Sequence, residues 1–152
     1  MRILLLCIAA FVFEGAAFST ADAASMLRRS NSQVVIGEHR FVVELARSPQ
    51  EWSRGLMFRD RLAPFEGMLF LGSEDSEERT QQFWMKNVPI SLDLIFISRS
   101  LKIVDIHHKA TPLSEESIFS RQPALHVLEI RGGRSKELGI KLGDRVEFKI
   151  SE

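Results

Sequence analysis

The chain has 152 residues, and its 20 basic and 20 acidic side chains give a formal net charge of zero at pH 7. Such a balance argues against a nucleic acid or an anionic membrane surface as the main partner. The one cysteine, Cys7, lies in an apolar N-terminal segment, so the rest of the chain has no disulfide, thiolate nucleophile or cysteine metal ligand.

Residues 1–23 have the three parts of a secretory signal peptide. Arg2 supplies a positive start, Ile3 to Phe13 form an apolar run, and the tripeptide Ala-Asp-Ala that ends at Ala23 is a suitable cleavage site. The apolar run is far shorter than the ~20 residues that a membrane-spanning helix needs. The sequence therefore predicts a periplasmic or secreted protein, cut near Ala23, that keeps no stable membrane anchor.

The first prediction concerns this cleavage. Exported protein should begin at Ala24, because the apolar run is too short to hold the chain in the bilayer. Intact-mass measurement of the exported protein checks the cleavage site. A mass that still includes residues 1–23 would contradict the prediction.

Local signals predict the first elements of the mature chain. Residues 24–33 are polar and are predicted to form a disordered lead-in. The β-prone runs Val34–Ile36 and Phe41–Ala46 flank Gly37-Glu38, which predicts a hairpin. A short helix should follow, because Ser48 can cap it, Pro49 suits its first position, and Glu51 completes a capping box.

The remaining segments continue the β pattern. Further strands are predicted at residues 67–71, 82–86, 92–98, 101–107, 125–130 and 145–150, with a short helix at 133–138. The acidic run 73–80 and the polar segment 111–123 are predicted loops. About eight short strands with one or two short helices predict a single mainly β domain over residues 34–152, a β-sandwich or barrel-like fold.

We expect one buried core beneath these elements. Its predicted members are apolar residues of the strands and of the first helix: Leu45, Leu56, Leu69, Phe70, Leu94, Phe96, Ile103, Val127 and Phe148.

Several stretches of the mature chain form a recognisable set. They are Arg54–Arg59 (RGLMFR), Gly67–Phe70 (GMLF), Phe83–Asn87 (FWMKN), Pro89–Asp93 (PISLD), Val127–Ile130 (VLEI) and Gly143-Asp144. In order and spacing they resemble the family called domain of unknown function 192 (DUF192), from about Val34 to Ile150. The resemblance implies a small, mainly β, sandwich-like fold, often behind a signal peptide. It implies no activity.

A first candidate site consists of cations, an amide and an aromatic ring near the predicted helix and a strand end. Its residues are Arg54, Arg59, Trp84, Lys86 and Asn87. If the helix packs beside this strand end, the cations could bind a carboxylate or phosphate, and Trp84 could form a platform for a ligand. Alternatively, the cations pair with the protein's own acids or face water.

Two carboxylates interrupt apolar strands. Asp93 lies within LDLIFI and Glu129 within LHVLEI, and a buried acid must be paired or protonated. The two could act as a general acid and base. They could equally be structural partners of Arg54, Arg59 or Lys86, which is the reading that we favour, and we therefore expect an ion pair between Arg54 or Arg59 and Asp93 or Glu129.

Soft metal ligands form a third group. Its possible members are Met57, Met68, Met85, Trp84, His107, His108 and His126. No Met-x-Met or His-x-His pair occurs, and methionine beside aromatic residues is ordinary core packing. The sequence therefore predicts neither a metal site nor another cofactor.

Taken together, the residues predict an exported binding module for a small anionic or glycan-like ligand, held by Arg54, Arg59, Trp84, Lys86 and Asn87. Two alternatives stay open. One is an envelope enzyme that uses Asp93 and Glu129 as an acid–base pair. The other is an interaction module for another envelope protein, with an exposed apolar patch around Phe58, Phe65 or Trp84.

Overall fold

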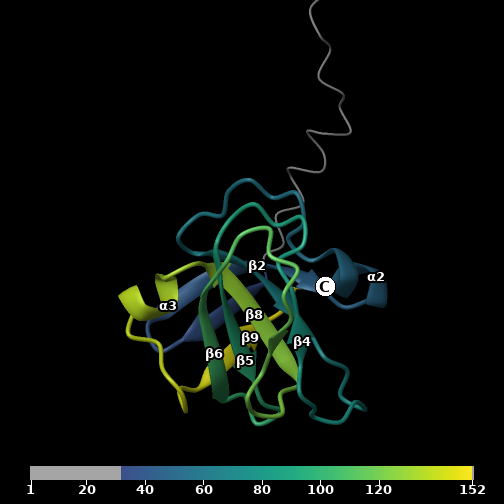
Figure 1. Ribbon diagram of the computed structural model, residues 1–152. Helices are drawn as coiled ribbons and strands as arrows, with labels where there is room; N and C mark the ends of the chain where they lie inside the picture. The colour runs from purple at the N-terminus through teal and green to yellow at the C-terminus, as the bar shows by residue number, and fades with distance from the viewer. Residues whose placement is uncertain (1–31, 152) are drawn as a thin grey trace, which may run out of the picture.

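The computed structural model describes residues 32–151, so the predicted signal peptide and nearly all of the predicted lead-in lie outside the described part (Figure 1). The described chain forms nine strands and two short helices: β1 Gln33–Ile36, β2 His39–Ala46, α2 Pro49–Arg54, β3 Glu66–Phe70, β4 Gln82–Phe83, β5 Leu92–Ile97, β6 Ile103–Ala110, β7 Ile118–Phe119, β8 His126–Arg131, α3 Arg134–Glu137 and β9 Val146–Lys149. Neither helix in this range is long and apolar enough to cross a membrane.

The locally encoded elements form where the sequence predicts them. The hairpin β1–β2 turns at Gly37, whose φ of 59° suits glycine. Helix α2 has the predicted capping box, because the Ser48 hydroxyl accepts the Glu51 N–H at 3.3 Å and the Glu51 carboxylate accepts the Ser48 N–H at 2.8 Å. Two details were predicted wrongly: β4 has only two residues, and β7 lies inside the predicted loop 111–123.

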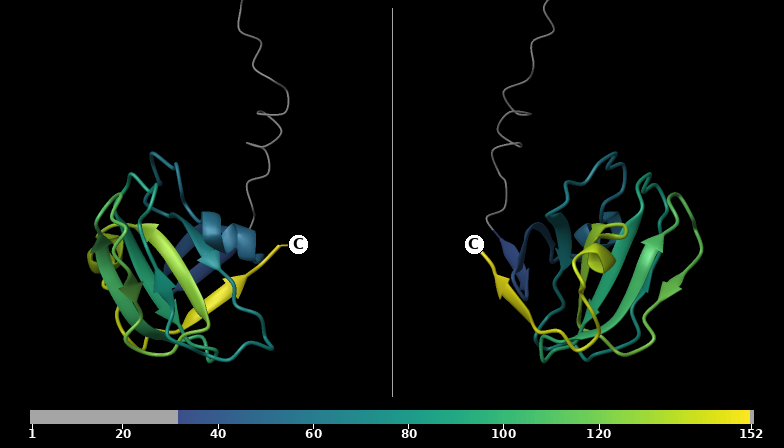
Figure 2. Two further views of the ribbon diagram at one scale, coloured as in Figure 1. Left: turned by 45° about the vertical axis from the view of Figure 1, so that its right-hand side comes forward. Right: turned by 90° about the vertical axis from the view of Figure 1, so that its left-hand side faces the viewer.

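Seven strands form one strongly curled sheet in the order β6-β5-β8-β3-β2-β1-β9 (Figure 2). The edge strands β6 and β9 meet at one end, where the Ile103 N–H donates to the Asp144 carbonyl at 3.0 Å and the Val146 N–H donates to the Leu101 carbonyl at 2.9 Å. Strands β4 and β7 form a separate two-stranded sheet. The mainly β, barrel-like fold is therefore confirmed.

The curled sheet buries apolar side chains on both faces. The inner core, inside the curl, comprises Val34, Ile36, Phe41, Val43, Leu69, Ile95, Ile97, Ile103, Ile106, Leu128, Ile130, Ile140 and Val146. The outer core lies between the opposite face and the loops that cover it, and comprises Ala46, Leu56, Leu62, Met68, Phe70, Met85, Val88, Leu92, Leu94, Phe96, Ala110, Ala124 and Val127. Because both faces are covered, every residue of β5 is buried.

The predicted core is correct in its residues but wrong in forming one cluster. Seven of its nine members are buried, while Leu45 and Phe148 are partly buried against the inner core. The sheet separates the members into the two cores, because successive side chains of a strand point to opposite faces.

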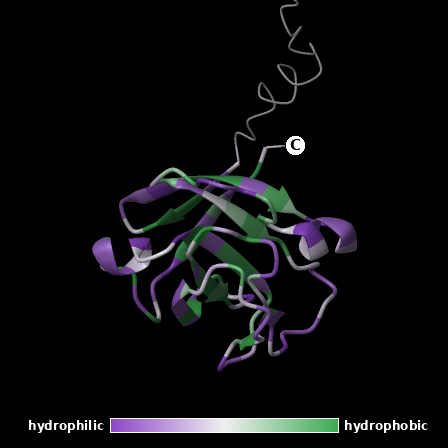
Figure 3. Cartoon of the chain, turned by 45° about the horizontal axis from the view of Figure 1, so that its top comes forward, coloured by the Kyte–Doolittle hydropathy of each residue, from purple (hydrophilic) through white to green (hydrophobic). Residues whose placement is uncertain are grey.

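The hydrophilic helices α2 and α3 flank the sheet on two sides (Figure 3).

Candidate functional site

Three loops gather at one end of the curled sheet, at the top of Figure 1. They are residues 55–62, 84–91 and 111–116, and we call their joint surface the three-loop face. Backbone hydrogen bonds join them: the Phe58 N–H donates to the Asn87 carbonyl at 2.7 Å, and the Leu113 N–H donates to the Val88 carbonyl at 3.0 Å. The loop 84–91 is thus hydrogen-bonded to both of the other loops.

The backbone of the three-loop face is unusual. Phe58, Asn87 and Leu113 have φ values of 62°, 58° and 60°, in the left-handed region that bulky side chains seldom adopt. Asparagine tolerates this region, but Phe58 and Leu113 in one hydrogen-bonded network are a local cost that the rest of the fold must offset, and such costs concentrate at functional sites. The conformation also leaves apolar side chains in solvent, with Phe58 75% exposed, Leu113 61% and Trp84 45%.

Two of the three cations of the three-loop face are already paired, while Arg61 is exposed and has no ion pair with a described residue. The Lys86 ammonium lies 5.2 Å from the centre of the Trp84 ring and 3.3 Å from the Glu115 carboxylate. Arg59 forms an ion pair with Glu44 of β2 at 2.5 Å. The structure thus brings Arg59, Trp84, Lys86 and Asn87 into neighbouring loops, as the sequence predicts, but with Lys86 and Arg59 neutralised. Arg54 is exposed in the last turn of α2.

The predicted ion pair between an arginine and Asp93 is wrong. The carboxylate of Asp93 is completely buried and accepts four hydrogen bonds. Backbone N–H groups of Lys109, Gly133 and Ser135 donate at 2.8, 2.8 and 2.9 Å, and the Ser135 hydroxyl donates at 2.5 Å. Main-chain donors therefore replace the expected guanidinium, and Asp93 links β5 to the end of β6 and to the start of α3.

The predicted arginine partner of Glu129 is also absent within the described residues. Glu129 is 4% exposed, and its Oε2 has no hydrogen-bond partner there. It lies on the outer face of β8, opposite Met68 of β3 and Leu94 of β5. Burial among these apolar side chains raises the pKa of the Glu129 carboxyl to about 8, so the group is protonated at neutral pH.

The two carboxylates do not form an acid–base pair. In the β5–β8 register, Asp93 lies opposite Ile130 of the inner core, whereas Glu129 lies opposite Leu94 of the outer core. Partners in register point to the same face, so the two carboxylates point to opposite faces of the sheet. One substrate cannot contact both carboxyl groups across the sheet, so this form of the enzyme hypothesis is wrong.

The methionines and histidines of the hypothetical metal group occupy different places. Met68 and Met85 are buried in the outer core, and Met57 packs against it. His126 instead accepts the Gly72 N–H at 3.1 Å through Nδ1 and its ring contacts Phe148, which packs on the inner core. The structure therefore gathers the three methionines in the outer core and separates His126 from them.

One constellation was missed in the sequence. Asp105 on β6 is 3% exposed and forms an ion pair with Arg121, which precedes β8. The signal was present, since Asp105 interrupts the apolar run Ile103-Val104-Asp105-Ile106 in the same way that Asp93 interrupts its own strand. Arg121 lies in a polar loop and had no such signal.

Comparison with known proteins gives a family and a fold. The model of DUF192, described as "Uncharacterized ACR", matches residues 32–148. A crystal structure of a protein of unknown function from Novosphingobium aromaticivorans DSM 12444 is 41% identical, with a TM-score of 0.69, over 76% of this chain and 82% of that one. A putative transcription regulator from Sinorhizobium meliloti 1021 is 40% identical, also with a TM-score of 0.69, over 77% and 91%. No curated protein matches. The chain belongs to the DUF192 family.

Proposed function

We propose that the protein is an exported binding module whose three-loop face holds a small, neutral, glycan-like ligand. The observation that supports this most is the exposure of Trp84 and Phe58 on loops whose backbone is held in a costly left-handed network. An aromatic ring with one wet face and polar neighbours is a common means of recognising amphipathic ligands.

The charges of the face support a neutral ligand over an anionic one. Glu115 and Glu44 already neutralise Lys86 and Arg59, and the third cation of the face, Arg61, is balanced by Asp60 and Glu116 on the same loops, so the face has no net positive charge to attract an anion. A sugar hydroxyl could instead accept from the Lys86 ammonium or pair with the exposed Asn87 amide, while the carbohydrate ring lies against Trp84. The geometry therefore favours the glycan-like class.

A thermal-shift screen tests this function, because a ligand that binds only the native state raises the melting temperature. Neutral oligosaccharides should raise it, and Trp84→Ala and Lys86→Ala should each abolish the shift. Both side chains are partly or largely solvent-exposed, so the variants should change the free energy of unfolding by no more than about 0.5–1 kcal/mol in the absence of ligand.

The matched control is Leu142→Ala, which also truncates an exposed apolar side chain, 56% exposed, outside the three loops. It should keep the ligand-induced shift. The proposal fails if no neutral glycan shifts the melting temperature, or if the shift survives in Trp84→Ala. A shift caused only by a co-purifying envelope protein would favour the interaction module instead.

A further inference from the structure

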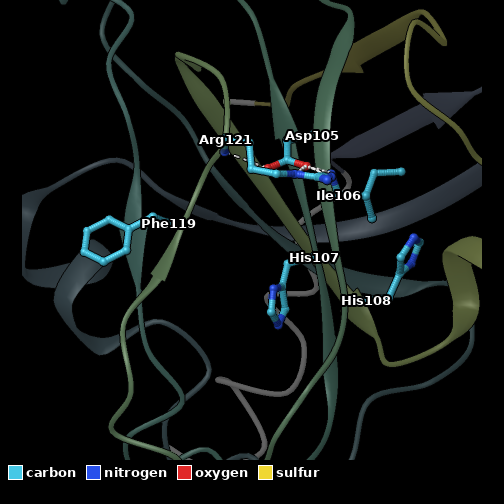
Figure 4. A pocket seen from close by; sticks show the side chains of 6 residues that line it. All are labelled: Asp105, Ile106, His107, His108, Phe119 and Arg121. Carbon is cyan, nitrogen blue, oxygen red and sulfur yellow. Dashed lines mark hydrogen bonds and ion pairs between the residues drawn. The ribbon is translucent and has the colours of Figure 1, made fainter.

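A cavity of about 470 Å³ lies along β6 and the segment that carries β7 (Figure 4). Its lining residues are Asp105, Ile106, His107, His108, Phe119 and Arg121. The size falls in the ordinary range for small-molecule sites. None of these residues belongs to the three-loop face, so a ligand here would be independent of the function proposed above.

The acceptor capacity of Asp105 is used within the protein. Its carboxylate accepts the Ile106 N–H at 2.8 Å, the Arg121 N–H at 2.7 Å and the Arg121 Nε–H at 2.8 Å, and it also accepts from Arg121 Nη2. Burial by itself would raise the pKa of Asp105, but the hydrogen bonds from Arg121 and Ile106 outweigh it and lower the pKa. Because Asp105 is almost fully buried and its carboxylate already accepts four hydrogen bonds, it contributes little to the binding of a ligand.

Arg121, in contrast to Asp105, keeps hydrogen-bonding groups that are free for a ligand. Its side chain is 72% exposed, yet the buried Asp105 fixes the guanidinium plane through Nε and Nη2. A guanidinium has five N–H groups, so three remain after these two bonds. An exposed but immobilised arginine loses less side-chain freedom on binding an oxyanion than a mobile one does.

His107 extends this donor surface. In the β5–β6 register Asp105 pairs with Phe96 and His107 with Leu94, and both partners belong to the outer core, so Asp105 and His107 lie on the same face of β6. His107 is exposed. His108 points away from them in Figure 4, and its Nδ1 lies 2.9 Å from the Ser135 hydroxyl. The open part of the cavity therefore offers an imidazole and a guanidinium beside the exposed Phe119, which also lines the cavity, whereas the Ile106 side chain points into the inner core.

We infer that this cavity binds a small organic oxyanion, a carboxylate or a phosphate monoester that carries an apolar group. Arg121 donates to the oxyanion from the edge that Asp105 leaves free, and His107 donates from the adjoining position on β6. The apolar group lies along Phe119. A ligand rich in acceptors fits because the cavity offers free donors, whereas its one carboxylate is buried and held by Arg121.

Three small probes that share a phenyl group test this site: benzoate, phenyl phosphate and the uncharged benzamide. In ¹H–¹⁵N spectra of the protein, benzoate or phenyl phosphate should shift the backbone amides of His107, Phe119 and Arg121 in a saturable manner. Benzamide should not, because it lacks the charge that a guanidinium recognises. The stronger of the two anions identifies the headgroup class.

Two variants locate the contact. His107→Ala removes an exposed donor, and Arg121→Lys keeps the charge but loses the planar fork; each should weaken the anion by about tenfold or more. Arg145→Lys, at another exposed arginine, should leave the affinity unchanged. If Arg121→Lys also loosens its loop, the His107→Ala variant still tests whether the cavity binds the anion, because His107 lies on β6. Absence of saturable shifts, equal binding of benzamide, or full affinity in His107→Ala would overturn the inference.

Discussion

Replacing Asp93 by alanine should lower the free energy of unfolding by about 3–5 kcal/mol, a large part of the stability of a small domain. The substitution leaves the N–H groups of Lys109, Gly133 and Ser135 buried without their acceptor. It also releases two backbone positions with left-handed φ values, Lys109 at 52° and Gly133 at 84°. The carboxylate holds both turns, so the end of β6 and helix α3 should loosen together.

Denaturant unfolding of the variant checks this result. Asp93→Asn keeps one acceptor oxygen and should lose less stability than Asp93→Ala. Asp60→Ala, which removes an exposed carboxylate, should stay within about 0.5 kcal/mol of the wild type. An Asp93→Ala variant as stable as Asp60→Ala would show that the four hydrogen bonds contribute nothing net.

The second large effect is a loss of stability as the pH rises from 6.5 to 8. The folded-state pKa of Glu129 is about 8 against an ordinary value of 4.5, because the group is buried. Between these values the unfolded chain has released a proton that the folded chain retains, so Glu129 lowers the stability by about 1.4 kcal/mol per pH unit.

His126 acts in the opposite direction at lower pH. Burial and then the charge of Arg99 lower its pKa from 6.5 to about 4. Between pH 4 and 6.5 the unfolded state therefore binds a proton that the folded state does not, and stability from this group falls as the pH falls. The contributions of Glu129 and His126 to the pH dependence of stability cancel from about pH 4.5 to 6.5. Above pH 6.5 only the contribution of Glu129 remains. The stability curve should be flat in the first window and then fall by about 2 kcal/mol up to pH 8.

Chemical denaturation at a series of pH values checks the shape of this curve. Glu129→Gln cannot ionise and should remove the fall above pH 6.5, whereas Glu66→Gln, at a half-buried carboxylate on β3, should keep it. A wild-type curve that stays flat to pH 8 would show that Glu129 ionises at an ordinary pH, and hence that it is solvated in solution.

The sequence predicted correctly the elements whose stabilising contacts join residues that are close together in the chain. The capping box at Ser48 and Glu51 and the hairpin at Gly37 depend on residues within four positions of each other, and both form as predicted. Strand positions followed from apolar runs. The two-residue β7 was missed because its pairing with β4, distant in the chain, defines it and its own composition does not.

The site was predicted less completely, for a physical reason. An acid within an apolar strand must be satisfied or neutral, and the sequence shows this need at Asp93, Asp105 and Glu129. It does not show the solution, which differs at each position: main-chain donors for Asp93, an arginine for Asp105 and protonation for Glu129. Only the register of β5 on β8 reveals that Asp93 and Glu129 point to opposite faces.

The pairing of the first strand with the last has a consequence for the order of events in the cell. Strand β1 lies between β2 and β9, with Gln33 opposite Lys149, so the first and last described strands are neighbours in the sheet. β9 is the last of the described strands to be synthesised, and until it exists one edge of β1 has no neighbour. Contacts so distant in sequence form slowly. The sheet of the nascent chain therefore cannot complete its strand pairing before β9 has been synthesised.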